Sequence, residues 1–137
     1  MKHLTSLVEG NTSFACDLYA RLKTEAGNLF FSPYSVATAL TMTYAGARGT
    51  TAEQMKKTLH STLEPKQLAP AFAELEARLN AIQHNGHVLL HSVNSIWAQQ
   101  GYQFLQEFLD LLVQRYQAAL KEVNFTASEE ARQEINA

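Results

Sequence analysis

The sequence predicts an α+β fold that is mainly helical. Five segments repeat apolar residues at the three- and four-residue spacing of a helix, and glycines or prolines stand between them. One further segment is apolar at both odd and even positions, which is typical of a strand packed on both faces. With 137 residues, of which 46% are apolar, the chain is large enough for one domain or for a large part of one.

The first thirty residues predict a helix followed by a short strand. Phe14, Leu18 and Leu22 recur at four-residue spacing, as on one face of a helix. We expect Gly27 to end this helix, because glycine adopts the left-handed conformation without steric cost. The aromatic-rich segment 28–31 is too short for a helix, so it predicts a buried strand.

A second helix is expected to begin at Ser32 and Pro33. Serine is a favourable N-cap, and proline suits the first helical position, where no N–H donor is needed. No residue from Pro33 to Ala45 is charged, so we expect this helix to be buried on several sides and to end at Gly46. Its larger side chains, close to one face, are Val36, Leu40 and Tyr44.

The third and fourth helices are separated by a polar stretch. Thr50 to Glu53 has the spacing of a capping box with Thr50 as N-cap. The residues from Ser61 to Pro70 predict a loop. The apolar stripe of the third helix is Ala52, Met55 and Leu59, and that of the fourth is Phe72, Leu75, Leu79 and Ile82.

The remaining elements follow a turn at Asn85–Gly86. The two-faced strand runs from Val88 to Ala98, and Gly101 ends it. Val123 and Phe125 alternate in a second short strand. Between the strands, a fifth helix is predicted by Phe104, Leu105, Phe108, Leu112 and Tyr116.

The last residues begin another helix. Thr126 to Glu129 again has the capping-box spacing, and Ala131 and Ile135 start an apolar stripe. A helix of about ten residues is marginal alone. We therefore expect that Ala137 is not a natural end.

Composition and charge argue against several classes of protein. The net charge is −2 with no basic patch, so nucleic acid is not an expected partner. No run approaches the roughly 18 apolar residues of a membrane span, and no apolar signal-peptide core follows Met1. The single Cys16 cannot form an internal disulfide, and we expect it to be half-buried on the first helix.

No catalytic or metal-binding pattern is convincing. His84, His87 and His91 lie close in sequence, but Gly86 interrupts any helix between them, and we interpret them as ordinary turn and strand residues. None of the common nucleophile, zinc or phosphate-binding motifs is present. We therefore expect no enzyme activity and no cofactor. The sequon at Asn124 lies in a predicted strand, a poor place for a glycan.

Several segments resemble the serpin family of protease inhibitors, in order along nearly the whole chain. Residues 28–40 resemble the strand and helix B of the serpin signature, and 46–55 the start of helix C. Segment 94–97 is similar to strand 2A, and 116–125 to the end of helix E and strand 1A. Residues 131–136 resemble the opening of helix F. The resemblance implies that 1–137 is the N-terminal portion of one serpin domain, truncated at its C-terminus, with helices A–E, the start of helix F, a short buried strand and strands 2A and 1A.

The resemblance also implies a function. Serpins present a reactive-centre loop as bait and, after cleavage, insert it into a central sheet. Ser32, Ser35 and Asn94 match the shutter, where that sheet opens. The reactive-centre bond would be absent from this chain, so the chain is expected not to inhibit by itself. The segment matching helix D has no basic cluster, so no heparin site is evident.

For the full-length parent, the implied partner is a serine-class protease, and the typical member is extracellular. Without a visible signal peptide, a cytoplasmic location stays open. Two alternatives also stay open: a self-sufficient helical interaction domain, and one half of a split serpin. We expect the isolated chain to self-associate through exposed strand edges.

Overall fold

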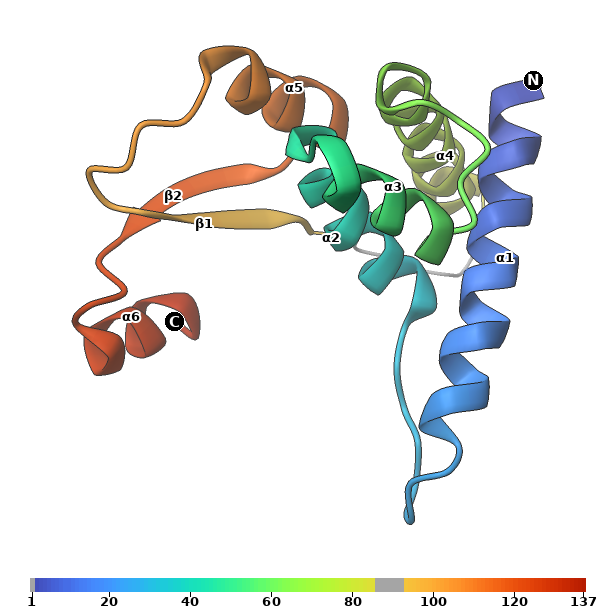
Figure 1. Ribbon diagram of the computed structural model, residues 1–137, viewed down its shortest axis with the longest axis horizontal. Coiled ribbons are helices and arrows are strands. Elements are labelled where there is room, and N and C mark those ends of the chain that lie inside the picture. The colour runs from blue at the N-terminus through green and yellow to red at the C-terminus, as the bar shows by residue number, and fades with distance from the viewer. Residues whose placement is uncertain (1, 86–92) are drawn as a thin grey trace. The chain divides into compact units, whose positions relative to one another are not determined.

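The computed structural model describes residues 2–85 and 93–137, which fall into two compact units. The first unit is Met1–Leu90 and the second is His91–Ala137. The first is entirely helical in its described part. The second combines a pair of parallel strands, the helix that connects them and a short C-terminal helix (Figure 1). This mainly helical architecture with a small sheet confirms the predicted fold class.

The first unit opens with α1 (Lys2–Leu22) and α2 (Pro33–Gly46). α1 ends five residues before the predicted stop at Gly27, whose φ is +113° within the turn that follows. Ser32 caps α2 and Pro33 opens it, both as predicted. Cys16 is exposed, so its expected half-burial was wrong.

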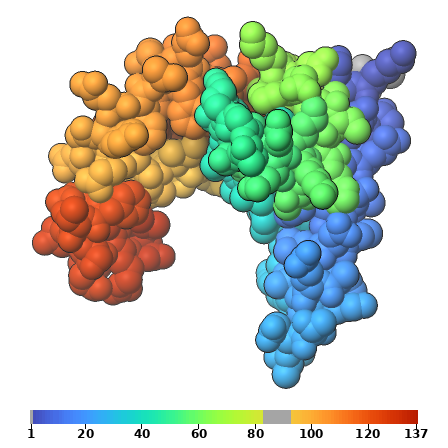
Figure 2. Space-filling view, viewed as in Figure 1, coloured from blue at the N-terminus to red at the C-terminus, as the bar shows by residue number. Residues whose placement is uncertain are grey.

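The segment 28–31 forms no strand, and its predicted burial was wrong. Leu29 is 41% exposed, and Phe30 is fully exposed. A lone strand has no hydrogen-bonding partner, and none of the described residues supplies one here. In Figure 2 the light-blue atoms around this segment project beyond the helices of the first unit.

α3 (Gly49–Thr58) begins earlier than the capping-box pattern predicted. Thr50 is the second residue of the helix, so it cannot serve as the N-cap, and that prediction was wrong. Arg48 is the residue before the helix, and its guanidinium donates to the carbonyls of Ala45 and Ala47 at 3.2 and 2.7 Å. Arg48 therefore fixes the turn between α2 and α3.

α4 (Pro65–Asn85) includes residues that the sequence assigned to a loop. Glu64 precedes it, and the Gln67 side chain accepts from the Glu64 N–H at 3.1 Å, which is the returning half of a capping box. Pro70 lies inside the helix and removes one main-chain hydrogen bond. The helix continues because the adjacent Ala69, Ala71 and Phe72 are all buried.

The core of the first unit lies where α1, α2 and α4 contact one another, with α3 packed on α2. α1 approaches the turn after α3 closely at Gly10, where an added Cβ would lie 2.8 Å from the His60 carbonyl oxygen. Val36, Ala39 and Thr43 are exposed, so the expected burial of α2 on several sides was partly wrong. The large buried residues of this core are Leu4, Leu7, Phe14, Met42, Tyr44, Leu59, Leu63, Leu68 and Phe72.

The second unit is built around β1 (Ser95–Gln99) and β2 (Ala119–Val123). The strands pair in parallel, from Ser95 with Ala119 to Gln99 with Val123. α5 (Gln106–Tyr116) forms the crossover that a parallel pair requires. Gly101, with φ +77°, follows β1 as predicted. Of the predicted strand 88–98, residues 88–92 lie outside the described residues, and residues 93–94 are not in a strand.

The chain continues from β2 into α6 (Ser128–Ile135), seen in red in Figure 1. Phe125 and Asn124 lie in the turn between them, not in a strand as predicted. Thr126 donates its hydroxyl to Asn124 Oδ1 at 2.6 Å and caps no helix, so the second capping box was also wrong. The residue before α6 is Ala127, which has no capping side chain.

Candidate functional site

The start of α2 brings together two of the three residues selected from the sequence. Ser32 Oγ accepts from the Ser35 main-chain N–H at 3.2 Å and lies 3.0 Å from Ser35 Oγ. Both residues are exposed. A hydroxyl both donates and accepts, so this pair can exchange its partners while the main-chain cap stays in place.

Tyr34, between these serines, ties α2 to α4. Its hydroxyl donates to Glu76 Oε1 at 2.6 Å, and its ring centroid lies 6.4 Å from that of Phe72. Burial, and then the neighbouring Glu76 carboxylate, raise the pKa of the Tyr34 hydroxyl above its usual 10.0. Tyr34 therefore remains a hydrogen-bond donor throughout the physiological pH range and holds the start of the helix.

The body of α2 buries polar hydroxyls without leaving them unsatisfied. Thr38 and Thr41 are 1% and 2% exposed. Their hydroxyls donate to the carbonyls of Tyr34 and Ala37, four residues earlier, at 2.9 and 2.7 Å. Because Thr38 and Thr41 bond carbonyls of their own helix, their buried hydroxyls need no polar partner on another element.

Asn94, the third selected residue, belongs to the second unit. Its side-chain amide reaches toward the carbonyl of Tyr116 at 3.5 Å, and its own carbonyl accepts from the Ala119 N–H at 2.9 Å. Tyr116 is 3% exposed, and burial raises the pKa of its hydroxyl. Asn94, the residue directly before β1, thus contacts the end of α5 and the start of β2.

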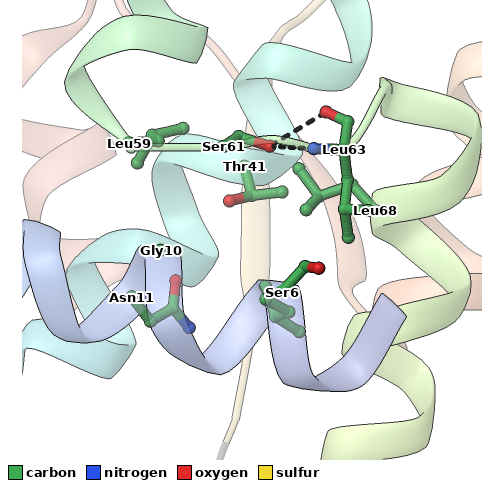
Figure 3. Close-up of a pocket in the computed structure, with 9 residues that line it drawn as sticks. Ser6, Gly10, Asn11, Thr41, Leu59, Ser61, Leu63 and Leu68 are labelled. Atoms are coloured by element: carbon green, nitrogen blue, oxygen red, sulfur yellow. Dashed lines mark hydrogen bonds between the residues drawn. The ribbon is translucent and has the colours of Figure 1, made fainter. Parts of the chain in front are cut away.

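Figure 3 shows a small pocket where α1 meets the turn before α4. Ser6, Gly10 and Asn11 line it from α1, and Ser61 and Leu63 line it from the turn. The Ser61 hydroxyl donates to the Leu63 carbonyl at 2.9 Å and accepts from the Leu63 N–H at 3.2 Å. The volume of this pocket is about 10 Å³, at the lower limit for a single water molecule. The pocket is therefore a packing feature and not a ligand site.

Two side-chain pairs were not anticipated from the sequence. Tyr34 and Glu76 are 42 residues apart, and His60 Nε2 lies 2.7 Å from Asp17 Oδ2 across 43 residues. His60 adopts a left-handed φ of +50°, which is uncommon for a residue other than glycine. No local sequence pattern signals either pair, because each depends on how distant helices pack.

The histidine cluster considered from the sequence falls largely outside the described residues. His87 and His91 lie outside the described residues, and nothing is described of the His84 side chain. Among the residues that the structure describes, no group of three metal-ligating side chains comes together.

Within residues 2–85 and 93–137, no helix combines the length and apolar character needed to cross a membrane.

A family model described as "Serpin (serine protease inhibitor)" matches residues 9–137. An uncharacterized serpin-like protein of Thermococcus kodakarensis is 40% identical over 131 residues, which are 95% of this chain and 30% of that protein. The leukocyte elastase inhibitor of Bos taurus is 39% identical over 137 residues, with 98% of this chain and 35% of that protein covered.

Solved serpin structures also match the fold. The solved structure described as cleaved Serpin 42Da matches with a TM-score of 0.74 and 30% identity, covering 98% of this chain and 33% of that one. The chain therefore spans about a third of the length of the proteins it matches.

Proposed function

The chain belongs to the family described as "Serpin (serine protease inhibitor)", and we propose that it forms the N-terminal, shutter-side part of such an inhibitor. The observation that carries this proposal is the family match across residues 9–137. That match includes the start of α2, where Ser32 and Ser35 bond to each other. By resemblance, these serines and Asn94 are shutter residues.

The proposed role of this part is to let a sheet open. In the serpin mechanism, the cleaved reactive-centre loop enters the central sheet as a new strand. The strands must then separate and move over α2. The uncharged surface of α2 and the exchangeable hydroxyls of Ser32 and Ser35 suit such movement, because no ion pair on this helix has to break.

The inhibitory bond itself is proposed to lie outside residues 1–137. No segment of the sequence resembles the reactive-centre loop, so the chain is expected not to inhibit by itself. We also expect no enzyme activity, because none of the common catalytic motifs is present. The proposed target of the parent protein is a serine-class protease. The elastase named for the leukocyte inhibitors is the first candidate to test.

Incubation with proteases tests this proposal. The chain would be mixed with leukocyte elastase, chymotrypsin and trypsin, and the products separated on denaturing gels. A complete leukocyte elastase inhibitor serves as the positive control. We expect proteolysis of the chain and no band at the summed mass of chain and protease. A covalent complex of that mass would contradict the proposal that this chain lacks the inhibitory bond.

A self-sufficient interaction domain is a second candidate, and the packed core of the first unit favours it. Phe72 and Leu68 are only 1% and 3% exposed. Against it stand large apolar side chains that no described residue covers, such as Phe30, Leu105 and Val93. Among the described residues, no further strand pairs with either edge of β1–β2, a poor arrangement for an isolated sheet. We therefore favour the serpin portion, with self-association through these edges when it is isolated.

A further inference from the structure

A second feature of the first unit is an open cleft between α1 and α3 that the serpin role does not use. Its volume is about 750 Å³, within the range of small-molecule sites. One wall is made by α1 and the other by α3 and the residue two positions after its end. The lining side chains are Phe14, Asp17, Leu18, Arg21, Gln54, Lys57, Thr58 and His60.

The floor of this cleft is apolar and its rim is polar. Phe14 is 5% exposed and Leu18 is half-buried, so both are fixed by the core behind them. Gln54 and Thr58 are exposed on the α3 wall. A ligand that fits this arrangement needs an apolar body with a polar or charged group at one end.

The charged groups of the rim indicate the sign of that end group. Asp17 supplies the only carboxylate among the lining residues, and His60 engages it at 2.7 Å. Arg21 and Lys57 form none of the ion pairs that the described residues contain. Two cations are thus left at the rim for an incoming anion, and a guanidinium matches the geometry of a carboxylate.

We propose that the α1–α3 cleft binds a small amphipathic carboxylate, with its apolar body over Phe14 and Leu18 and its carboxylate toward Arg21 and Lys57. This proposal concerns a different site from the shutter residues and does not depend on the proposed serpin function. Its ligand class is set by the cleft volume, the apolar floor and the two available cations.

A purely structural role for the two cations makes a different prediction. Arg21 and Lys57 each lie in the last turn of their helix, where a cation stabilises the helix dipole. If the two cations have only that role, substituting either one should lower the stability slightly and leave ligand binding unchanged. The test must therefore measure binding and stability separately.

Titration of the isotopically labelled full chain with 2-naphthoate, followed by NMR, provides the binding measurement. The neutral analogue 2-naphthalenemethanol is the matched ligand control. We expect naphthoate to shift amide signals of α1 and α3, and the neutral analogue to bind about fivefold more weakly or worse. Raising the salt from about 0.05 to 0.5 M should weaken naphthoate binding, because both cations are exposed.

Substitutions identify the groups responsible. Arg21→Gln and Lys57→Gln should each raise the Kd about fivefold, whereas Lys66→Gln, which alters an exposed cation of α4 outside the cleft, should leave it unchanged. Asp17→Asn removes the repelling carboxylate and should lower the Kd about twofold. Circular dichroism checks that each variant stays folded.

Three results would overturn the proposal. The first is no binding of naphthoate at concentrations up to about 10 mM, which corresponds to less than about 3 kcal/mol of binding free energy. The second is equal binding of the neutral analogue, which would indicate a non-specific apolar surface. The third is a loss of affinity in Lys66→Gln as large as in Arg21→Gln, which would indicate attraction by overall charge.

Discussion

The N-terminus of α2 permits a quantitative test, because two neighbouring serines make different contributions there. Ser32 Oγ accepts from the Ser35 N–H, which no carbonyl of the helix can satisfy. Ser35 Oγ only bonds Ser32 Oγ, and both side chains are exposed. Replacing each serine by alanine therefore separates the main-chain cap from the hydroxyl pair.

The expected costs differ clearly. Ser32→Ala should destabilise the first unit by about 1 kcal/mol, the usual value for a lost N-cap. Ser35→Ala should cost less than about 0.5 kcal/mol, because water replaces the exposed hydroxyl bond and alanine is the better helix former. For a unit of this size, the first loss corresponds to a Tm lower by about 4–8 °C.

Thermal and urea unfolding followed by far-ultraviolet circular dichroism measures both variants. Ser32→Gly is a useful control, because glycine is itself an acceptable N-cap and should cost only a few tenths of a kcal/mol. If Ser35→Ala proved as costly as Ser32→Ala, the hydroxyl pair and not the cap would hold the helix start, and our reasoning would be wrong.

Three further predictions follow from burial and ionisation in the described residues. Phe72→Ala should cost about 3–5 kcal/mol in urea unfolding, whereas Phe30→Ala should change the stability by less than about 0.5 kcal/mol; similar losses for both would contradict the assigned core. Gly10→Ala should lower the Tm even though alanine favours helices, because its Cβ would meet a main-chain oxygen at 2.8 Å; a higher Tm would show that this contact relaxes freely. Stability should fall above about pH 10 by up to about 1.4 kcal/mol per pH unit for each of Tyr34 and Tyr116, because each ionises in the unfolded chain while its raised pKa keeps it protonated in the folded one; urea unfolding of Tyr34→Phe between about pH 9 and 11.5 should show a shallower fall for the first unit, and an unchanged slope would contradict this assignment.

Much of the fold could be predicted because the signals are local. The cap at Ser32 and Pro33 depends on residues within one helical turn, and both were confirmed. The stripe ending in Leu112 and Tyr116 likewise lies in α5, with both of these residues buried. The capping-box patterns at Thr50 and Thr126 failed because the helices begin at other residues, and a local spacing cannot fix that choice.

The remaining errors involve interactions between distant parts of the chain. The aromatic segment 28–31 has the composition of a strand, but a strand forms only with a partner. The sequence did not show which side of α2 is buried, because this helix carries no charge and offers little contrast between a buried Ala37 and an exposed Val36. Pro70 suggested a loop, but burial of its neighbours keeps it within α4.

The candidate site could be predicted only where its contacts are between residues close in sequence. Ser32 and Ser35 were selected by resemblance, and their mutual hydrogen bond follows from their spacing at the start of a helix. The Tyr34–Glu76 and His60–Asp17 pairs were missed because neither has a sequence signature. Both pairs connect elements that meet only once the first unit has packed.

The most direct test of our central proposal is the association state of the isolated chain. A serpin portion in which no described residue covers Phe30, Leu105 or the edges of β1–β2 should self-associate as its concentration rises. Analytical ultracentrifugation over a hundredfold concentration range, from about 1 to 100 μM, measures this directly, and we predict a rising average mass. A monomer at every concentration that also unfolds in one cooperative transition would contradict the proposal and support a self-sufficient domain.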